Sequence, residues 1–294
     1  MKLSILTWNL GYAGLGKESN FIVDGGWRLF PPSKKIVEKN LIGIKTFIAS
    51  NPSDVILFQE ITKCSPLNFW VKMLDLINAS LKEYESSFEC DMYSRYLPSL
   101  LKPIHGSAIY SKYSIKESEK VILSQPLNTR LTFIEKLNHL HYVLIFDPIS
   151  DKKLIIGNIH LPAFDRDAEL RFQQLNKIMD FARQKHQEGF TVIIGGDWNL
   201  KLSNKEFAHE TPEKYLFWIH DFPYSHLPKD WSLTYDPKTP TVRTNQRRYT
   251  EGINFRTIID GFLCSPNVKI LDIDTADLSF QYTDHHPVKL TITI

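Results

Sequence analysis

Polar side chains follow several apolar runs of this sequence, at the points where the runs end. In IIGGDWNLKL (residues 193–202) an Asp and an Asn stand two positions apart after four apolar or small residues. Asp and Asn are ordinary turn residues, so a simple turn would explain this pair alone. The pattern recurs, however, and the other runs end at Asn9, Glu60, Asn158 with His160, Asp260, and Asp284 with His285. Catalytic residues gather at the ends of elements on a rigid scaffold, so the set predicts a functional site.

The residue types in this set indicate hydrolysis assisted by a metal. Carboxylates with a neighbouring amide suit a hard cation with oxygen ligands, Mg²⁺ or Mn²⁺. A carboxylate beside a histidine suits a general acid or base whose imidazole is oriented by the carboxylate. The sequence contains neither a G-x-S-x-G nucleophile elbow nor a phosphate-binding G-x-x-x-x-G-K-[ST] loop. The attacking group is therefore expected to be water.

The elements that must position these side chains alternate in type along the chain. Apolar patterns predict strands over 3–8, 54–59, 191–195, 256–264, 268–273 and 287–294, and helices over 33–50, 66–82 and 165–187. Between residues 85 and 158, short β-prone runs separated by turns indicate sheet meanders. Short helices are expected over 205–220, and residues 225–252 form a long polar loop of a kind that is often functional. Strands covered on one face predict two sheets packed together with helices outside, an α/β (α+β) layered sandwich.

Bulk properties bound the answer without choosing a substrate. The chain has 294 residues and a formal net charge of +2, which leaves small phosphate esters, lipids and nucleic acids open. Three cysteines without a C-x-x-C pair argue against a disulfide framework and a thiolate zinc site. We recognise neither a cleavable signal nor an apolar run long enough to span a membrane. We expect one domain over residues 1–294 that acts as a cytoplasmic monomer.

Seven short motifs together resemble a known superfamily. They are TWN, FQE, GSAIYSKYSI, NIHL, GGDWN, IIDGF and TDHHP, and they follow one another between residues 3 and 287. In this order they resemble the endonuclease/exonuclease/phosphatase superfamily, which has the DNase I-like fold. GYAGLG…DGG near the start and YTEGINFRTIIDGFLCSPNVKI near the end are similar to a bacterial branch called RgfB-like. The resemblance implies a four-layer αββα sandwich of two mainly antiparallel sheets flanked by helices, and hydrolysis of a phosphoester.

The resemblance also implies which residues hold the metal and the substrate. Glu60 is the principal metal ligand, assisted by Asn9 and Asp284, and the ion is Mg²⁺ or Mn²⁺. The metal would polarise the phosphoryl oxygens and stabilise the leaving oxyanion. Three arginines are further candidates for contacts to the substrate: Arg28, Arg130 and Arg243.

The remaining site residues have catalytic roles by the same resemblance. Asp197 would orient or activate the attacking water, Asn199 would hold a phosphate oxygen, and His160 would contact the scissile phosphate. Asp260 and His285 would form the oriented carboxylate–imidazole pair, and either Asp197 or His285 would be the base. In an extended segment, residues i and i+2 point to the same side. Asp197 and Asn199 are therefore expected to face one phosphate, with Trp198 turned back toward the core.

Three substrate classes compete at this level. A nuclease should carry basic loops, for which TVRTNQRRYT offers Arg243, Arg247 and Arg248, but no aromatic and basic stripe is evident. An enzyme of this fold that acts on membrane lipids often carries an exposed hydrophobic hairpin, and the sequence shows no clear one. We favour a small-molecule or lipid-headgroup phosphoester, with DNA or RNA as the alternative. A non-catalytic binding module is the third and least favoured reading.

Overall fold

The strands of this protein send alternate side chains into two different layers. The computed structural model describes the whole chain except residues 95–97, 99–101, 125–134, 148–151, 164 and 166. In β1 (Lys2–Asn9), Leu3 and Ile5 face the apolar layer between two sheets, while Leu6 and Trp8 pack beneath helix α1 (Lys34–Ser50). Successive side chains of a strand point to opposite faces, so one strand serves both layers.

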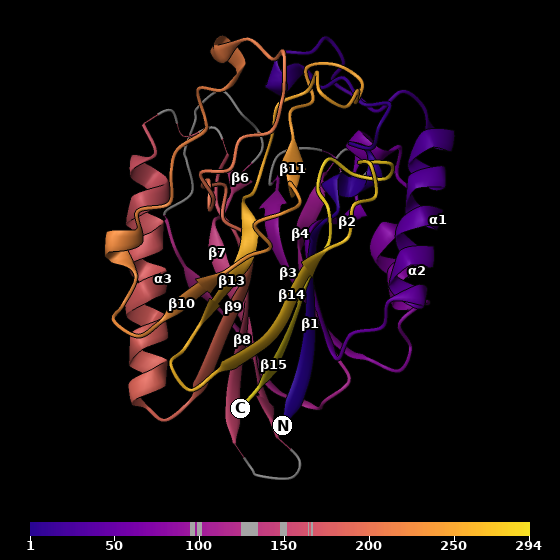
Figure 1. Cartoon of the computed structure of the whole chain (residues 1–294). Helices are drawn as coiled ribbons and strands as arrows, with labels where there is room; N and C mark the ends of the chain where they lie inside the picture. The colour runs from indigo at the N-terminus through magenta and orange to yellow at the C-terminus, as the bar shows by residue number, and fades with distance from the viewer. Residues whose placement is uncertain (95–97, 99–101, 125–134, 148–151, 164, 166) are drawn as a thin grey trace.

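Two sheets pack face to face between helices, which confirms the predicted four-layer αββα sandwich (Figure 1). One sheet has the order β14-β15-β1-β2-β4-β3-β6, the other β10-β13-β9-β8-β7-β5, and β11 pairs with β12. Only the pairs β1–β2 and β8–β9 are parallel among the strands described. Helices α1 and α2 (Met73–Asn78) cover the first sheet, and α3 (Glu169–Gln187) covers the second.

The strands near both ends of the chain overlap the predicted runs, but the single strand predicted over 256–264 is wrong, because this run forms two strands in different sheets. The first sheet contains β14 (Lys269–Thr275), β15 (Val288–Thr293), β1, β2 (Val55–Cys64), β4 (Ile104–Ser111), β3 (Glu85–Tyr93) and β6 (Glu135–Lys136). The second contains β10 (Ser232–Thr234), β13 (Asp260–Cys264), β9 (Thr191–Asp197), β8 (Lys153–His160), β7 (His139–Phe146) and β5 (Ile115–Ile122). The small ribbon is β11 (Val242–Arg243) with β12 (Arg256–Thr257).

Two of the predicted helices form as expected and the others are shorter. Ser33 caps α1, since its Oγ accepts a hydrogen bond from the backbone N–H of Ile36 at 3.3 Å. The continuous helix predicted over residues 66–82 is wrong, because only a 3₁₀ turn at Pro66–Asn68 and α2 form there. Phe69 and Trp70 have φ of 55° and 54°, a left-handed conformation that ends a helix. Within residues 205–220 the only helical piece is a 3₁₀ turn at Glu213–Tyr215.

Cys64, Cys90 and Cys264 are all free thiols, and Cys264 is buried. In the part of the chain that is described, none of the helices combines the length and apolar character needed to cross a membrane.

The polar strand ends lie at one end of the sandwich, away from the termini. The N- and C-termini meet at the lower end in Figure 1, where the backbone N–H of Ile294 donates to the carbonyl of Met1 at 3.1 Å. At the other end, β1, β8 and β9 finish at Asn9, His160 and Asp197, and β13 begins beside them at Asp260. The second sheet therefore contributes an imidazole and two carboxylates to the same edge that receives Asn9 from the first.

Candidate active site

A cavity of about 310 Å³ opens at this end of the two sheets. Most of the predicted site residues line it: Glu60, His160, Asp197, Asn199, Asp284 and His285. Asn9 and Asp260 are hydrogen-bonded to residues that line the cavity. The Nδ2 of Asn9 donates to Oδ2 of Asp197 at 3.0 Å and to Oε1 of Glu60 at 3.3 Å, and Asp260 bonds to His285. Side chains from both sheets and from six separate parts of the sequence thus form one cluster.

Glu60 reaches the cavity through a bulge in β2. The prediction that this strand ends at Glu60 is wrong, because β2 continues to Cys64. Its register against β4 shifts between Phe58 and Ile61, and Glu60 has φ of 51°. A bulge inserts an unpaired residue, bends the strand and redirects a side chain, and such features are frequent beside active sites. The bulge places the Glu60 carboxylate 3.6 Å from Nε2 of His160.

The DWN segment, residues 197–199, forms a turn and also contributes side chains to the cavity. Asn199 has φ of 47°, and its backbone N–H donates to Oδ1 of Asp197 at 2.9 Å. The expectation of an extended segment is therefore wrong, because the chain turns immediately after β9. Both residues still line the cavity, but Nδ2 of Asn199 donates to the carbonyl of Leu161 at 2.7 Å. Trp198 turns back as predicted and packs in the apolar layer beneath α3.

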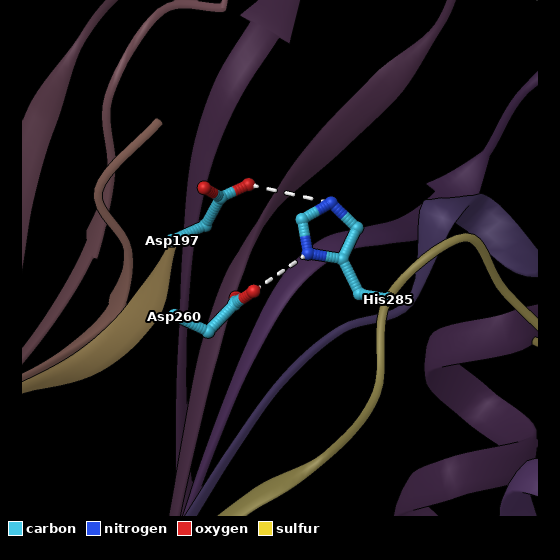
Figure 2. A group of neighbouring side chains, drawn as sticks. All are labelled: Asp197, Asp260 and His285. Carbon is cyan, nitrogen blue, oxygen red and sulfur yellow. Dashed lines mark hydrogen bonds and ion pairs between the residues drawn. The ribbon is translucent and has the colours of Figure 1, made fainter. Parts of the chain in front are cut away.

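His285 lies between two buried carboxylates (Figure 2). Its Nδ1 is 2.9 Å from Oδ2 of Asp260, and its Nε2 is 3.6 Å from Oδ2 of Asp197. Burial by itself lowers the pKa of His285, but Asp260 and Asp197 outweigh burial and raise the pKa to about 10. The imidazole is therefore protonated at neutral pH. Burial raises the pKa of Asp197 to about 7, and the positive charge of His285 opposes this shift.

His160 has the opposite electrostatic character. Burial, then Lys136 and His285, hold the pKa of His160 well below its ordinary value, so this imidazole is neutral. Its Nε2 lies 3.7 Å from Oδ2 of Asp197, and its Nδ1 has no hydrogen-bond partner among the described residues. One histidine of the site is thus held charged and the other neutral.

The adjacent His286 belongs to the fold and not to the cavity. Its ring stacks on Phe280 with centroids 3.8 Å apart, its Nδ1 is 2.9 Å from the carbonyl of Pro240, and its Nε2 accepts from the N–H of Phe280. The TDHHP motif therefore presents only its first imidazole to the site.

The donor set fits a divalent cation. Glu60 and Asp284 both line the cavity, and burial followed by repulsion from Asp284 raises the pKa of Glu60 to about 7. Close carboxylates that repel each other and supply oxygen ligands are the setting that Mg²⁺ and Mn²⁺ prefer. The Oδ1 of Asn9 accepts from the N–H of Gly11 at 3.0 Å, so its NH₂ faces the carboxylates. This orientation favours a role for Asn9 in positioning Glu60 over direct ligation.

A second grouping could in principle hold a cation. Ligand atoms of Asp197, Asp260 and His285 all lie within 4.8 Å of one another. However, both nitrogens of His285 face carboxylates, and a protonated imidazole has no lone pair to offer. The Glu60 and Asp284 side of the cavity is therefore the better candidate for a metal, and the His285 side for a proton.

The three candidate arginines differ in their surroundings. Arg243 lines the cavity, yet its guanidinium is buried and donates to the carbonyls of Leu15, Gly16 and Thr244 at 2.7–3.1 Å. Its visible role is to hold the loop that follows β1. Arg28 stacks on Trp27 at 4.2 Å and is not among the described residues that line the cavity. Arg130 lies outside the described residues.

Sequence reasoning missed several residues of the cavity wall. They are Tyr12, Asp24, Asp91, Lys136 and Trp218. Tyr12 follows β1 in the GYAGLG segment, whose glycines were a signal of unusual backbone close to the site. Lys136 and Asp91 come from β6 and β3, short or irregular strands whose approach to the cavity no local pattern reveals.

The fold and the cavity together define a class, namely hydrolases that place carboxylates and imidazoles at the mouth of a double-sheet sandwich. The model of the endonuclease/exonuclease/phosphatase family matches residues 6–285, and the chain belongs to this family. Its members are metal-dependent hydrolases of phosphoester bonds, and this protein is an enzyme of that kind. The predicted superfamily is thus confirmed, while the narrower RgfB-like resemblance is not confirmed by the matches.

Solved structures share the fold at low sequence identity. An endonuclease/exonuclease/phosphatase from Beutenbergia cavernae DSM 12333 superposes with a TM-score of 0.65 at 16% identity, covering 100% of this chain and 72% of that chain. TDP2 of D. rerio, complexed with a single strand DNA product, gives 0.62 at 16% identity, covering 100% and 99%. A family protein from Leptotrichia buccalis C-1013-b gives 0.63 at 14% identity, covering 99% and 100%. No curated protein sequence matches the chain.

Proposed function

We propose that this protein hydrolyses the phosphoester of a small molecule or a lipid headgroup, using Mg²⁺ or Mn²⁺. The observation that carries the proposal is the meeting of Glu60, Asp197, Asp284 and His285 around one cavity. Glu60 and Asp284 would hold the ion, with Asn9 orienting Glu60. When bound, the ion would supply positive charge to the phosphoryl oxygens and the leaving oxygen.

The protein's own groups divide the proton chemistry between them. His285 is protonated, so it can donate from Nε2 to a phosphoryl oxygen as negative charge builds there. Asp197 is the better proton acceptor, and it would take the proton of the attacking water while the new P–O bond forms and the ester P–O bond breaks. The neutral His160 and the second N–H of Asn199 would contact the remaining phosphoryl oxygens.

The charge of the cavity supports a small or headgroup substrate. Among its described lining residues, the lysines and arginines are Lys136 and Arg243, against the carboxylates of Asp24, Glu60, Asp91, Asp197 and Asp284. A groove that follows a nucleic-acid backbone needs many cations, because phosphate contacts dominate its affinity. The guanidinium of Arg243 is moreover occupied by backbone carbonyls.

Exposed apolar side chains near the cavity support the lipid-headgroup reading. No hydrophobic hairpin was evident from the sequence, but the loop after β1 exposes five large apolar residues: Ile22, Val23, Trp27, Leu29 and Phe30. Phe21 and Val23 of the same loop line the cavity. Apolar and aromatic side chains at the mouth of a site can rest in the headgroup region of a bilayer.

The alternative function is a nuclease on DNA or RNA. TDP2 of D. rerio, which shares the fold, is complexed with a single strand DNA product. Arg247 and Arg248 are exposed in the same loop as Arg243, where they could contact a longer phosphate chain. Salt separates the two functions, because binding to a nucleic-acid groove weakens steeply as salt rises.

The test is a panel of phosphoinositides, sphingomyelin, nucleotides, plasmid DNA and RNA, each assayed with Mg²⁺, with Mn²⁺ and with EDTA. We expect hydrolysis of a lipid-headgroup or small phosphoester that EDTA abolishes. His285→Ala should lower the rate by at least about 10²-fold, while His226→Ala, a surface imidazole bonded to Asn176, should not. Hydrolysis that survives EDTA, or a fully active His285→Ala variant, would refute the assignment.

A further inference from the structure

The turn after β1 has an unusual backbone that carries a tyrosine into the cavity. Gly11, Tyr12 and Ala13 have φ of 46°, 43° and 58°, so three consecutive residues are left-handed. For residues other than glycine this conformation costs about 1–2 kcal/mol each. Neighbours fix the turn from both sides, because Asn9 accepts from the N–H of Gly11 and Asn40 donates to the carbonyl of Ala13 at 3.0 Å.

The Tyr12 side chain is packed so that its ring has little freedom. It is 6% exposed, and its ring centroid lies 5.7 Å from that of His105. A Cβ added at Gly14 would meet the Tyr12 ring at 2.7 Å, so the following turn closes over the ring. The side chain lines the same cavity as Glu60 and Asp284.

The hydroxyl of Tyr12 has no hydrogen-bond partner among the described residues, although it is buried. Such a group costs about 1–3 kcal/mol, because it has lost water and gained nothing in return. Burial, then the charges of Glu60, Asp284 and Asp24, raise the pKa of Tyr12 well above its ordinary value. The hydroxyl therefore keeps its proton at physiological pH and remains a donor.

The cost of the strained turn and of the unpartnered donor is explained if an acceptor arrives with the substrate. We propose that the Tyr12 hydroxyl donates a hydrogen bond to a phosphoryl oxygen of the bound phosphoester, which makes Tyr12 a substrate-contacting residue. This inference rests on the proposed function of the same cavity. The acceptor would be an anionic oxygen of the phosphoester. A bound cation and the hydrogen-bond donors around this oxygen would share its charge, so that it can lie among the carboxylates.

Tyr12→Phe tests the proposal because it removes the hydroxyl and keeps the ring. The free protein should be as stable as the wild type or more stable, since an unpartnered buried group is lost. Binding of inorganic phosphate in the presence of Mg²⁺, measured by calorimetry, should weaken by about 10- to 100-fold, the value of a hydrogen bond to a charged group. The loss of kcat/KM on the substrate found in the panel should be similar.

Tyr110→Phe is the matched control. Tyr110 is 1% exposed, but its hydroxyl donates to Oδ1 of Asn78 at 2.6 Å, on the helix side of β4. This variant should lose thermal stability and keep phosphate binding and kcat/KM. If Tyr12→Phe instead loses stability and binds phosphate normally, its hydroxyl is structural and the inference is overturned. If the wild type neither binds phosphate nor hydrolyses any substrate of the panel, the proposed function fails and this inference fails with it.

Discussion

The Glu60→Gln substitution separates the destabilising effect of the Glu60 charge from the proposed role of that charge in binding the metal. Glu60 and Asp284 are like charges in one partly buried cavity, and Oε1 of Glu60 accepts a hydrogen bond from Nδ2 of Asn9 at 3.3 Å. Glutamine has the same shape and can keep that bond, but it carries no charge. We therefore expect Glu60→Gln to stabilise the protein in EDTA at pH 8 and to abolish its stabilisation by Mg²⁺.

The size of the effect follows from the pKa of Glu60, which burial and Asp284 raise from 4.5 to about 7. A raised carboxyl pKa means that the folded state binds the proton more tightly than the unfolded chain, so stability is lost as pH rises from 4.5 to about 7. Each pKa unit corresponds to about 1.4 kcal/mol, which sets an upper limit of about 3 kcal/mol above pH 7. Because 26% of the Glu60 side chain is exposed to screening solvent, we expect about 1–2 kcal/mol.

Thermal unfolding with EDTA and with Mg²⁺ measures both halves of this prediction. The wild-type Tm should rise with Mg²⁺, whereas the Tm of Glu60→Gln should be higher in EDTA and insensitive to the ion. Asp54→Asn is the control of opposite sign, since hydrogen bonds from Ser4 lower the pKa of Asp54 against a raising effect of burial. That control should lose stability. A Glu60→Gln variant that is less stable than the wild type in EDTA, or that Mg²⁺ stabilises equally, would refute the reasoning.

Three further predictions concern the layer between the sheets and the loop beside the cavity. Burial lowers the pKa of His141 to about 3, so below pH 6.5 the unfolded chain binds a proton that the folded chain does not bind. At pH 5 this difference lowers the free energy of unfolding by about 2 kcal/mol. The free energy of unfolding of His141→Gln, measured in urea, should therefore depend less on pH than that of the wild type. Asn158→Ala should lower stability by about 2–4 kcal/mol in urea, since the Asn158 amide donates to two backbone carbonyls and accepts from Gln59 at 2.6 Å. Arg243→Lys should lower the Tm by losing bonds to loop carbonyls, whereas Arg247→Ala should leave it unchanged and, on a nucleic-acid substrate, reduce the salt slope by about one.

The sequence predicted the fold well where a strong periodic pattern coincided with clear boundary residues. The strands near Leu3 and Ile193 and the helix capped by Ser33 combine strong patterns with clear boundaries, and all three form. The helix predicted after Pro66 fails because Phe69 and Trp70 adopt left-handed backbone, which apolar spacing does not reveal. Tertiary packing there overrides a good local pattern.

The site was predicted in membership more than in geometry. Polar residue types at strand ends were sufficient to collect Asp197, Asp260 and His285, which the structure brings within 4.8 Å of one another. The bulge at Glu60 was not predictable, because it depends on the strand that packs opposite. The residue types of Asp197 and Asn199 allowed a turn, but they did not reveal that the turn and the cavity coincide. Likewise, nothing in the sequence around Arg243 distinguishes a guanidinium that faces a substrate from one that holds a loop.

In β8 and β2 the side chains that face the layer between the sheets change from apolar to polar toward the cavity, and this gradient allows polar groups to be buried at the site. In β8 the inward side chains are Leu154 and Ile156, then Asn158, then His160. The same order, from apolar through amide to ionisable, appears in β2 of the facing sheet, where Leu57 is followed by Gln59, which donates to Asn158 at 2.6 Å, and then by Glu60. A charged side chain placed deeper between the sheets would lose more solvation free energy than its interaction partners could compensate. A charged side chain placed nearer the rim would be free to move. Hydrogen-bonded amides provide a rigid polar floor, so the carboxylates and His285 can be desolvated enough for chemistry and still be held in place.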